Sequence, residues 1–136
     1  MNVFTYGSLM YPVVWQQVVR GRYRSSTATI HGFRRVCVRN ETYPALIISS
    51  GAETVEGRVH FDVSATDIAR LDHFETDSYQ RVTIAVTIES RALIAEAYLA
   101  LNLSSLSEEA WSETAFEQRG LPLFLATYVL HNNLPK

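Results

Sequence analysis

The sequence predicts an α+β domain whose strands, mostly antiparallel, curl toward a barrel or half-barrel with helices beside it. Two observations support this fold class. Apolar and polar residues alternate through Val55 to Val63 and through Gln80 to Glu89, as they do in half-buried strands. Helical spacing of apolar residues occurs instead near the start, in the middle and at the end of the chain. We therefore expect six or seven strands, one early helix, one central helix and helices at the end.

The first half of the chain is expected to consist mainly of strands. Val3 to Tyr6 is a β-branched and aromatic run, and it leads into the glycine turn at residues 7–10. Pro12 is well placed in the first turn of a short helix over Val13 to Arg20, which Gly21 ends. The other strands are expected at Thr27 to His31, Phe33 to Arg39, residues 45–49 and Val55 to Val63, with a later hairpin of Gln80 to Glu89 and Ala92 to Leu101.

The C-terminal part is expected to be helical. Ser107 with the two following acidic residues is typical of a helix N-terminus, where acidic groups meet the positive end of the helix dipole. Residues 120–122 (Gly-Leu-Pro) are expected to break the chain. The apolar run Leu123 to His131 should then form a last helix that docks on the sheet.

The composition is that of an ordinary globular protein. With 136 residues, of which 47% are hydrophobic and 19% charged, a single domain over residues 1–136 is expected. A net charge of −2 gives no general attraction to nucleic acid, and no apolar run approaches the ~20 residues of a membrane-spanning helix. The first residues show no secretion signal, so we expect a cytoplasmic protein without nucleic-acid or membrane partners. The sequence leaves the oligomeric state open.

Residue types that bind metals or form disulfides are sparse. Cys37 is the single cysteine, so an intramolecular disulfide is excluded. No two of the four histidines stand at a spacing typical of metal ligands. We therefore expect no metal and no other cofactor.

Glu75 occupies an unusual place at the end of the central helix. Ser64 is a good N-cap, and Ile68 and Leu71 lie on one face of the helix that follows. Glu75 falls on the same face, one turn beyond Leu71, where a carboxylate is costly unless it is paired or neutralised. Two interpretations are open. Either the helix ends at Phe74 and Glu75 faces solvent, or Glu75 lines a pocket, has a raised pKa and transfers protons.

A second candidate is the glycine turn after the first strand. Successive backbone N–H groups in Tyr6-Gly7-Ser8-Leu9 can form a cradle for a carboxylate or an oxyanion, although a plain strand-to-helix turn has the same pattern. The turn is no phosphate loop, because it lacks the GxxxxGK pattern. Ser8 stands in no GxSxG motif, which argues against a serine hydrolase. The remaining polar candidates, each weak by itself, are Tyr43, Tyr79, Arg81 and Tyr98.

Taken together, four segments resemble the γ-glutamylcyclotransferase-like family in order and spacing: FTYGSLM, YPALI, VEGRV and LDHFETDSYQR. The tail EEAWSETAFEQRGLPLFL resembles the plant avirulence-induced branch of that family, so the resemblance covers nearly the whole chain. It implies a small mixed, mostly antiparallel β-barrel with flanking helices, and a pocket between the YGSL loop and a glutamate that Glu75 matches. This favours the pocket interpretation of Glu75. The substrate-binding residues it implies are Tyr6, Gly7, Ser8, Leu9, Tyr43, Tyr79, Arg81 and Tyr98.

The resemblance also implies an activity. An enzyme of this kind cyclises a γ-glutamyl group to 5-oxoproline and releases an amine, with Glu75 as general acid and base and no cofactor. The implied partner is a small γ-glutamyl compound, whose amine the sequence does not identify. The alternative is a non-catalytic module of the same fold that binds a small carboxylate. One departure from the family pattern is Thr76, since many relatives carry glycine directly after the glutamate.

Overall fold

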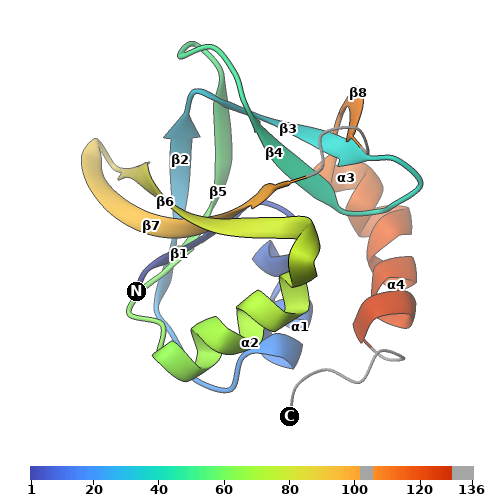
Figure 1. The fold of residues 1–136 in the computed structure, drawn as a ribbon, viewed down its shortest axis with the longest axis horizontal. Coiled ribbons are helices and arrows are strands. Elements are labelled where there is room, and N and C mark those ends of the chain that lie inside the picture. The colour runs from blue at the N-terminus through green and yellow to red at the C-terminus, as the bar shows by residue number, and fades with distance from the viewer. Residues whose placement is uncertain (102–105, 130–136) are drawn as a thin grey trace.

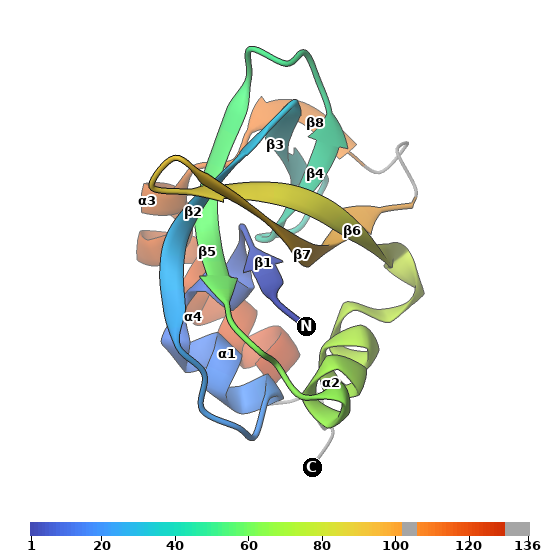
Figure 2. The same cartoon turned by 90° about the vertical axis from the view of Figure 1, so that its left-hand side faces the viewer.

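Five strands close into a barrel in the order β1-β5-β2-β6-β7 (Figures 1 and 2). The structure is a computed structural model, and it describes residues 1–101 and 106–129. β1 runs parallel to β7 where they pair, and the other neighbours are antiparallel, which confirms the mixed, mostly antiparallel barrel. The barrel strands are β1 (Val3–Thr5), β2 (Ser25–His31), β5 (Thr54–His60), β6 (Tyr79–Ile88) and β7 (Arg91–Ala100).

A second sheet of three strands lies beside the barrel, in the order β4-β3-β8 (Figure 1). Its strands are β4 (Pro44–Ile48), β3 (Phe33–Val38) and β8 (Leu106–Ala110). The helix start expected at Ser107 is therefore wrong, because Ser107 lies within β8. Val36 and Val38 of β3 pair with Ala110 and Leu106, so β8 satisfies backbone groups at the edge of β3 that a helix would leave open.

Helices cover one end of the barrel (Figures 1 and 2). The helical segments before the last barrel strands are η1 (Ser8–Met10), α1 (Pro12–Val18), α2 (Ala65–Glu75) and η2 (Thr76–Ser78). Near the C-terminus, consecutive helical segments follow one another: α3 (Glu113–Ala115), η4 (Phe116–Gly120), α4 (Leu121–Phe124) and η5 (Leu125–Val129). None of the helices in the described part of the chain combines the length and apolarity needed to cross a bilayer.

The break expected at residues 120–122 is wrong. Gly120 has helical backbone angles (φ −73°, ψ −39°), and Pro122 lies in the first turn of α4, where a proline interrupts least. The preceding turn, η4, is π-helical, and such wide turns tolerate irregular backbone hydrogen bonding. The expected helix end at His131 lies outside the described residues.

The core divides into two clusters. One fills the barrel and includes Phe4, Ile30, Leu46, Val59 and Val86. The other joins the helices to the barrel end and includes Val14, Trp15, Val18, Leu71, Phe116 and Phe124. Because the second cluster holds α1, α2 and the C-terminal helices together, it fixes the end of α2 against the loop that follows β1.

Asp67 anchors the start of α2. Its side chain is 1% exposed, and its carboxylate accepts hydrogen bonds from the backbone N–H groups of Arg20 and Gly21, from the Tyr23 hydroxyl and from Arg70. Burial by itself raises the pKa of this carboxyl, but the hydrogen bonds outweigh burial and lower the pKa to about 2. Ser64 caps the same helix as expected, since its hydroxyl accepts from the Asp67 N–H.

Replacing Asp67 with asparagine should destabilise the fold. A neutral amide with a single acceptor oxygen cannot accept all four hydrogen bonds, so we expect a loss of about 2 kcal/mol in the free energy of unfolding at pH 7. Because the native pKa is depressed, the stabilisation is present above pH ~4 and is lost as the pH falls toward 2. Urea unfolding of both proteins at several pH values measures this, and curves that stay equally separated down to pH 2 would contradict it.

Candidate active site

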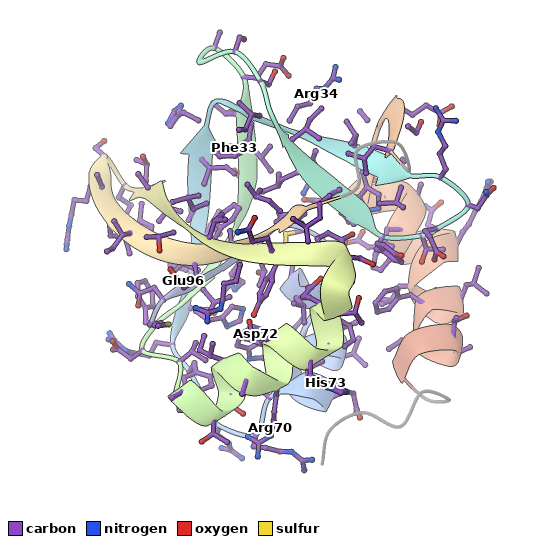
Figure 3. The ribbon with its side chains drawn as sticks, in the orientation of Figure 1. Phe33, Arg34, Arg70, Asp72, His73 and Glu96 are labelled. Carbon is purple, nitrogen blue, oxygen red and sulfur yellow. The ribbon has the colours of Figure 1, made fainter. Side chains whose placement is uncertain are left out.

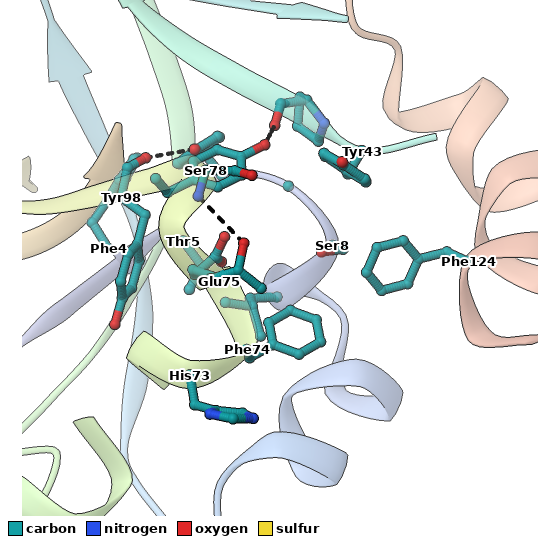
Figure 4. A pocket seen from close by; sticks show the side chains of 16 residues that line it. Phe4, Thr5, Ser8, Tyr43, His73, Phe74, Glu75, Ser78, Tyr98 and Phe124 are labelled. Atoms are coloured by element: carbon teal, nitrogen blue, oxygen red, sulfur yellow. Dashed lines mark hydrogen bonds between the residues drawn. The ribbon is translucent and has the colours of Figure 1, made fainter. Parts of the chain in front are cut away.

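A pocket of about 290 Å³ opens where the loop after β1 meets the end of α2 (Figure 4). Its walls include residues 6–9 of the loop, Glu75 at the end of α2 and the ring of Tyr79 at the start of β6. Tyr43 and Tyr98 complete the set of predicted residues that line it. Of the site residues predicted from sequence, the structure thus brings together all except Arg81.

Glu75 is the last residue of α2, and its half-buried side chain lines the pocket (Figure 4). The helix therefore extends past Phe74, and Glu75 does not project freely into solvent. Burial raises the pKa of its carboxyl from 4.5 to about 8. Within residues 1–101 and 106–129 no side-chain hydrogen bond or ion pair holds this carboxyl, so it is left to meet a ligand. At neutral pH it is mostly protonated in the empty pocket.

The loop opposite Glu75 is held by three contacts. Gly7 packs against Pro44, and a Cβ added to Gly7 would lie 2.6 Å from the Pro44 Cγ. Arg35 donates a hydrogen bond of 2.8 Å to the Tyr6 carbonyl, and the Tyr6 hydroxyl donates one of 2.6 Å to the Tyr98 carbonyl. The next residues turn into η1, whose first N–H groups have no partner within the turn. The loop is thus fixed in the wall of the pocket.

Three tyrosine hydroxyls near Glu75 are already engaged in hydrogen bonds. The Tyr79 hydroxyl donates to the Pro44 carbonyl at 3.1 Å, and the Tyr98 hydroxyl donates to Asp72 at 2.7 Å. Burial raises the pKa of Tyr6, Tyr79 and Tyr98, and the negative charge of Glu75 raises each further. These phenols therefore keep their protons and shape the pocket. Glu75 is the carboxyl in the described lining that can exchange a proton.

Arg81 does not line the pocket, contrary to the expectation that it contacts a substrate. Its guanidinium pairs at 2.9 Å with Asp72 of α2 and at 2.6 Å with Glu96 of β7, and Figure 3 labels both carboxylates. Side chains alternate along a strand, so Tyr79 and Arg81 share a face of β6. Arg81, however, is two positions further along the strand and lies beyond the cavity. Arg81 is linked to the pocket through Asp72, which accepts from Tyr98, and Tyr98 is also the residue that pairs with Arg81 between β6 and β7.

The roles of Phe124 and Arg35 at the site were not predicted from sequence. Phe124 lines the pocket from α4, 49 positions after Glu75, and only the packing of the C-terminal helices places it there. Arg35 lies outside the pocket lining, yet it donates to the Tyr6 carbonyl, and its guanidinium stacks on Trp111 at 4.9 Å from the ring centroid. Neither residue carries a local sequence signal for these roles.

Thr76, directly after Glu75, has φ 63° and ψ −164°. This backbone region is occupied almost only by glycine, and a β-branched residue there is strained by roughly 1–3 kcal/mol. Glycine adopts these backbone angles without such strain. In this chain the strain is located at the joint that orients Glu75, and the Thr76 hydroxyl partly offsets it by accepting from the Ser78 N–H at 3.3 Å.

Replacing Thr76 with glycine should stabilise the protein. Relief of strain outweighs the lost hydrogen bond and the added freedom of the unfolded chain, so we expect about 1 kcal/mol in the free energy of unfolding. The matched control is Thr66→Gly, within the helical backbone of α2, which should destabilise by roughly 0.3 kcal/mol. Urea unfolding of both variants measures the two changes in the free energy of unfolding, which should have opposite signs. A T76G protein that is less stable than the parent would show that Thr76 is not strained.

The sequence pattern of the family described as gamma-glutamyl cyclotransferase, AIG2-like, matches residues 3–114. The chain belongs to this family. The match contains both sides of the pocket described above, the loop after β1 and the end of α2. It ends before most of the C-terminal helical segments, so Phe124 lies outside it.

Relatives in Arabidopsis thaliana support the assignment to this family. AIG2-like protein A is 29% identical over 119 residues, which cover 86% of this chain and 70% of that protein. Protein AIG2 C is 34% identical over 85 residues, which cover 62% of this chain and 51% of that protein. The chain thus spans only about half the length of Protein AIG2 C.

Solved structures show the same gamma-glutamyl cyclotransferase-like fold. A solution structure from Arabidopsis thaliana is 25% identical with a TM-score of 0.68, and the match covers 93% of this chain and 87% of that one. A gamma-glutamyl cyclotransferase is 15% identical with a TM-score of 0.66, covering all of this chain and 92% of that one. At such identity the likeness concerns the fold alone.

Proposed function

We propose that this protein cyclises the γ-glutamyl group of a small amide to 5-oxoproline and releases the amine. The observation that carries the proposal is a half-buried carboxyl, Glu75, whose pKa is raised by burial to about 8 and which shares one pocket with the loop at residues 6–9. Family membership supports the same reaction type. A cavity of about 290 Å³ lies near the lower end of the range for ligand pockets, which suits a small substrate.

In the proposed complex, the loop amides bind the α-carboxylate of the glutamyl group or the oxyanion that forms during the reaction. No lysine or arginine is among the described residues that line the pocket, so uncharged donors bind that charge: backbone N–H groups of the loop and hydroxyls such as that of Ser8. The pocket holds the chain of the glutamyl group bent, with its amine near its own γ-carbonyl. Ring closure then gains from proximity because both reacting groups belong to one molecule.

Glu75 would transfer the protons. The α-ammonium of the substrate favours the carboxylate form of Glu75, which accepts one proton and frees the amine to attack the γ-carbonyl carbon. A base of pKa about 8 accepts a proton from an ammonium group more readily than an ordinary carboxylate does. As the new C–N bond forms, Glu75 returns its proton to the leaving nitrogen and the old C–N bond breaks. The second proton of the ring nitrogen leaves with the departing amine, which is released as an ammonium ion.

A screen of γ-glutamyl amides tests the proposal, with 5-oxoproline detected by mass spectrometry. Formation of 5-oxoproline that depends on the protein and on Glu75 is the expected result. Binding of these amides in calorimetry without any product would refute catalysis and favour a non-catalytic module that binds small carboxylates. The absence of both binding and product would refute a γ-glutamyl site altogether.

A further inference from the structure

Four aromatic rings form a continuous wall of the pocket, which we call the aromatic arc: Phe74, Phe124, Tyr43 and Tyr79. Neighbouring rings lie 6.2 Å (Phe74 to Phe124), 6.2 Å (Phe124 to Tyr43) and 6.4 Å (Tyr43 to Tyr79) apart between centroids. Phe124 reaches into the pocket from α4 and faces Phe74 and Tyr43 (Figure 4). The arc thus joins the end of α2, the β4 side of the cavity and the C-terminal helices.

Fixed charge is missing from this wall. Among the described residues that line the pocket, the groups that can carry an ionic charge near neutral pH are Glu75 and His73, and His73 lies at the exposed margin. The two arginines discussed above stand outside the lining and are engaged, Arg35 with the Tyr6 carbonyl and Glu113, and Arg81 with Asp72 and Glu96. A carboxylate placed against the aromatic arc would therefore lose its water without gaining a cationic partner.

We propose that the aromatic arc is the subsite for the leaving amine. It selects an amine whose substituent is apolar and carries no charge, such as an arylalkylamine, against an amino acid. This inference rests on the proposed function and names the class of its substrate. The glutamyl part already uses the loop amides for its own carboxylate. What remains for the amine is a wall of rings, on which apolar and aromatic groups are stabilised by burial and ring contacts.

Phe124 is the specificity-determining residue of this subsite. It is 3% exposed, contacts two other members of the arc and comes from a helical segment outside the part of the chain that the family pattern matches. The chemistry at Glu75 and the loop is therefore supplied by the shared region, whereas the choice of amine depends on a residue of the C-terminal segment.

The test compares two donors that differ only in one carboxylate, γ-glutamylphenethylamide and γ-glutamylphenylalanine. We expect kcat/KM for the phenethylamide to exceed that for the phenylalanine compound at least tenfold. γ-Glutamylmethylamide, which has the same reacting bond without the ring, should fall below the phenethylamide by a similar factor. γ-Glutamylputrescine extends the panel to an ammonium-bearing amine, and preference for it would refute an uncharged leaving group.

Two variants test the role of the arc. Phe124→Ala should lower kcat/KM for the phenethylamide at least tenfold more than it lowers kcat/KM for the methylamide. Phe124 is a core residue, and its truncation can unfold the protein. The second variant is therefore Tyr43→Ala, at a half-buried position, which should also lower the ratio of kcat/KM for the phenethylamide to kcat/KM for the methylamide. The matched control is Leu123→Ala, the neighbouring residue in α4, which is 58% exposed and does not line the pocket. Thermal unfolding monitors whether each variant is folded.

The outcomes separate this inference from the proposed function. If the donors are cyclised but γ-glutamylphenylalanine is used as well as the phenethylamide, or both arc variants leave the ratio unchanged, the subsite assignment is wrong while the function stands. If no donor is cyclised, the affinities of γ-glutamylphenethylamide and γ-glutamylphenylalanine, measured by calorimetry, decide whether the arc is the amine subsite. Tighter binding of the phenethylamide, lost in the arc variants, would support the subsite even though the proposed catalysis had failed, and equal binding would overturn it.

Discussion

Glu75→Gln should remove turnover by a factor on the order of 10²–10⁴ while the fold remains intact. Glutamine has nearly the shape of the glutamate and stays neutral, as the carboxyl mostly does in the empty pocket at neutral pH, but it neither accepts nor returns a proton. The measurement is kcat/KM for the best γ-glutamyl donor, with 5-oxoproline detected by mass. Glu56→Gln, at an exposed position on β5 outside the pocket, is the matched control and should retain parent activity.

The same substitution has a pH signature in activity. In the parent protein, kcat/KM should rise with pH as Glu75 loses its proton near its pKa of about 8, until the substrate ammonium also deprotonates. The residual activity of the Gln variant should lack this rise. If kcat/KM of the parent protein has already reached its plateau by pH 6, or if the Gln variant turns over as fast as the parent, another group transfers the proton.

Stability should depend on pH with the opposite sign to that of Asp67. Because the native pKa of Glu75 is raised, the folded chain holds a proton that the unfolded chain releases, so stability is highest below pH ~4.5 and falls as the pH rises toward 8. The Gln variant escapes this fall, and at pH 8.5 it should exceed the parent by about 2 kcal/mol, a value reduced from the full shift because the side chain opens to the pocket. Urea unfolding at both pH values measures the difference.

Gly7→Ala should lower turnover by about 10- to 100-fold through displacement of the loop. The added Cβ would lie 2.6 Å from Cγ and 2.7 Å from Cδ of Pro44, and a proline ring cannot swing away as a flexible side chain does. The loop must therefore move from its present position in the pocket wall. The reason for glycine here is close packing, not a left-handed backbone, since Gly7 has φ −138°.

A double-mutant cycle tests this cause directly. Pro44→Ala removes Cγ and Cδ but keeps the carbonyl that accepts from Tyr79, so the double variant should recover much of the activity that Gly7→Ala loses. Gly51→Ala is the matched control, because an added Cβ there has no neighbour within 4 Å. An active Gly7→Ala protein, or a double variant no better than the single one, would show that the loop tolerates the contact.

Much of the architecture could be predicted from local patterns. Alternation in residues 80–88 is a property of the segment itself, and it correctly placed the β6–β7 hairpin, whose partners run from Tyr79 and Ala100 to Ile88 and Arg91. Local rules failed where a distant segment decided the outcome. Ser107 satisfies the rule for a helix start, yet pairing with β3 makes the segment a strand.

By itself the sequence determined the family, the barrel with flanking helices, and the two motifs that form opposite sides of the pocket. These features depend on residue spacing within short segments, and this spacing is visible in the sequence without knowledge of the fold. Only the tertiary structure decided that Arg81 stays outside the pocket, that Phe124 enters it from α4, and that burial raises the pKa of Glu75. Burial and charge compensation are sums over neighbours far apart in the chain, so they exist only once the helices have packed against the barrel.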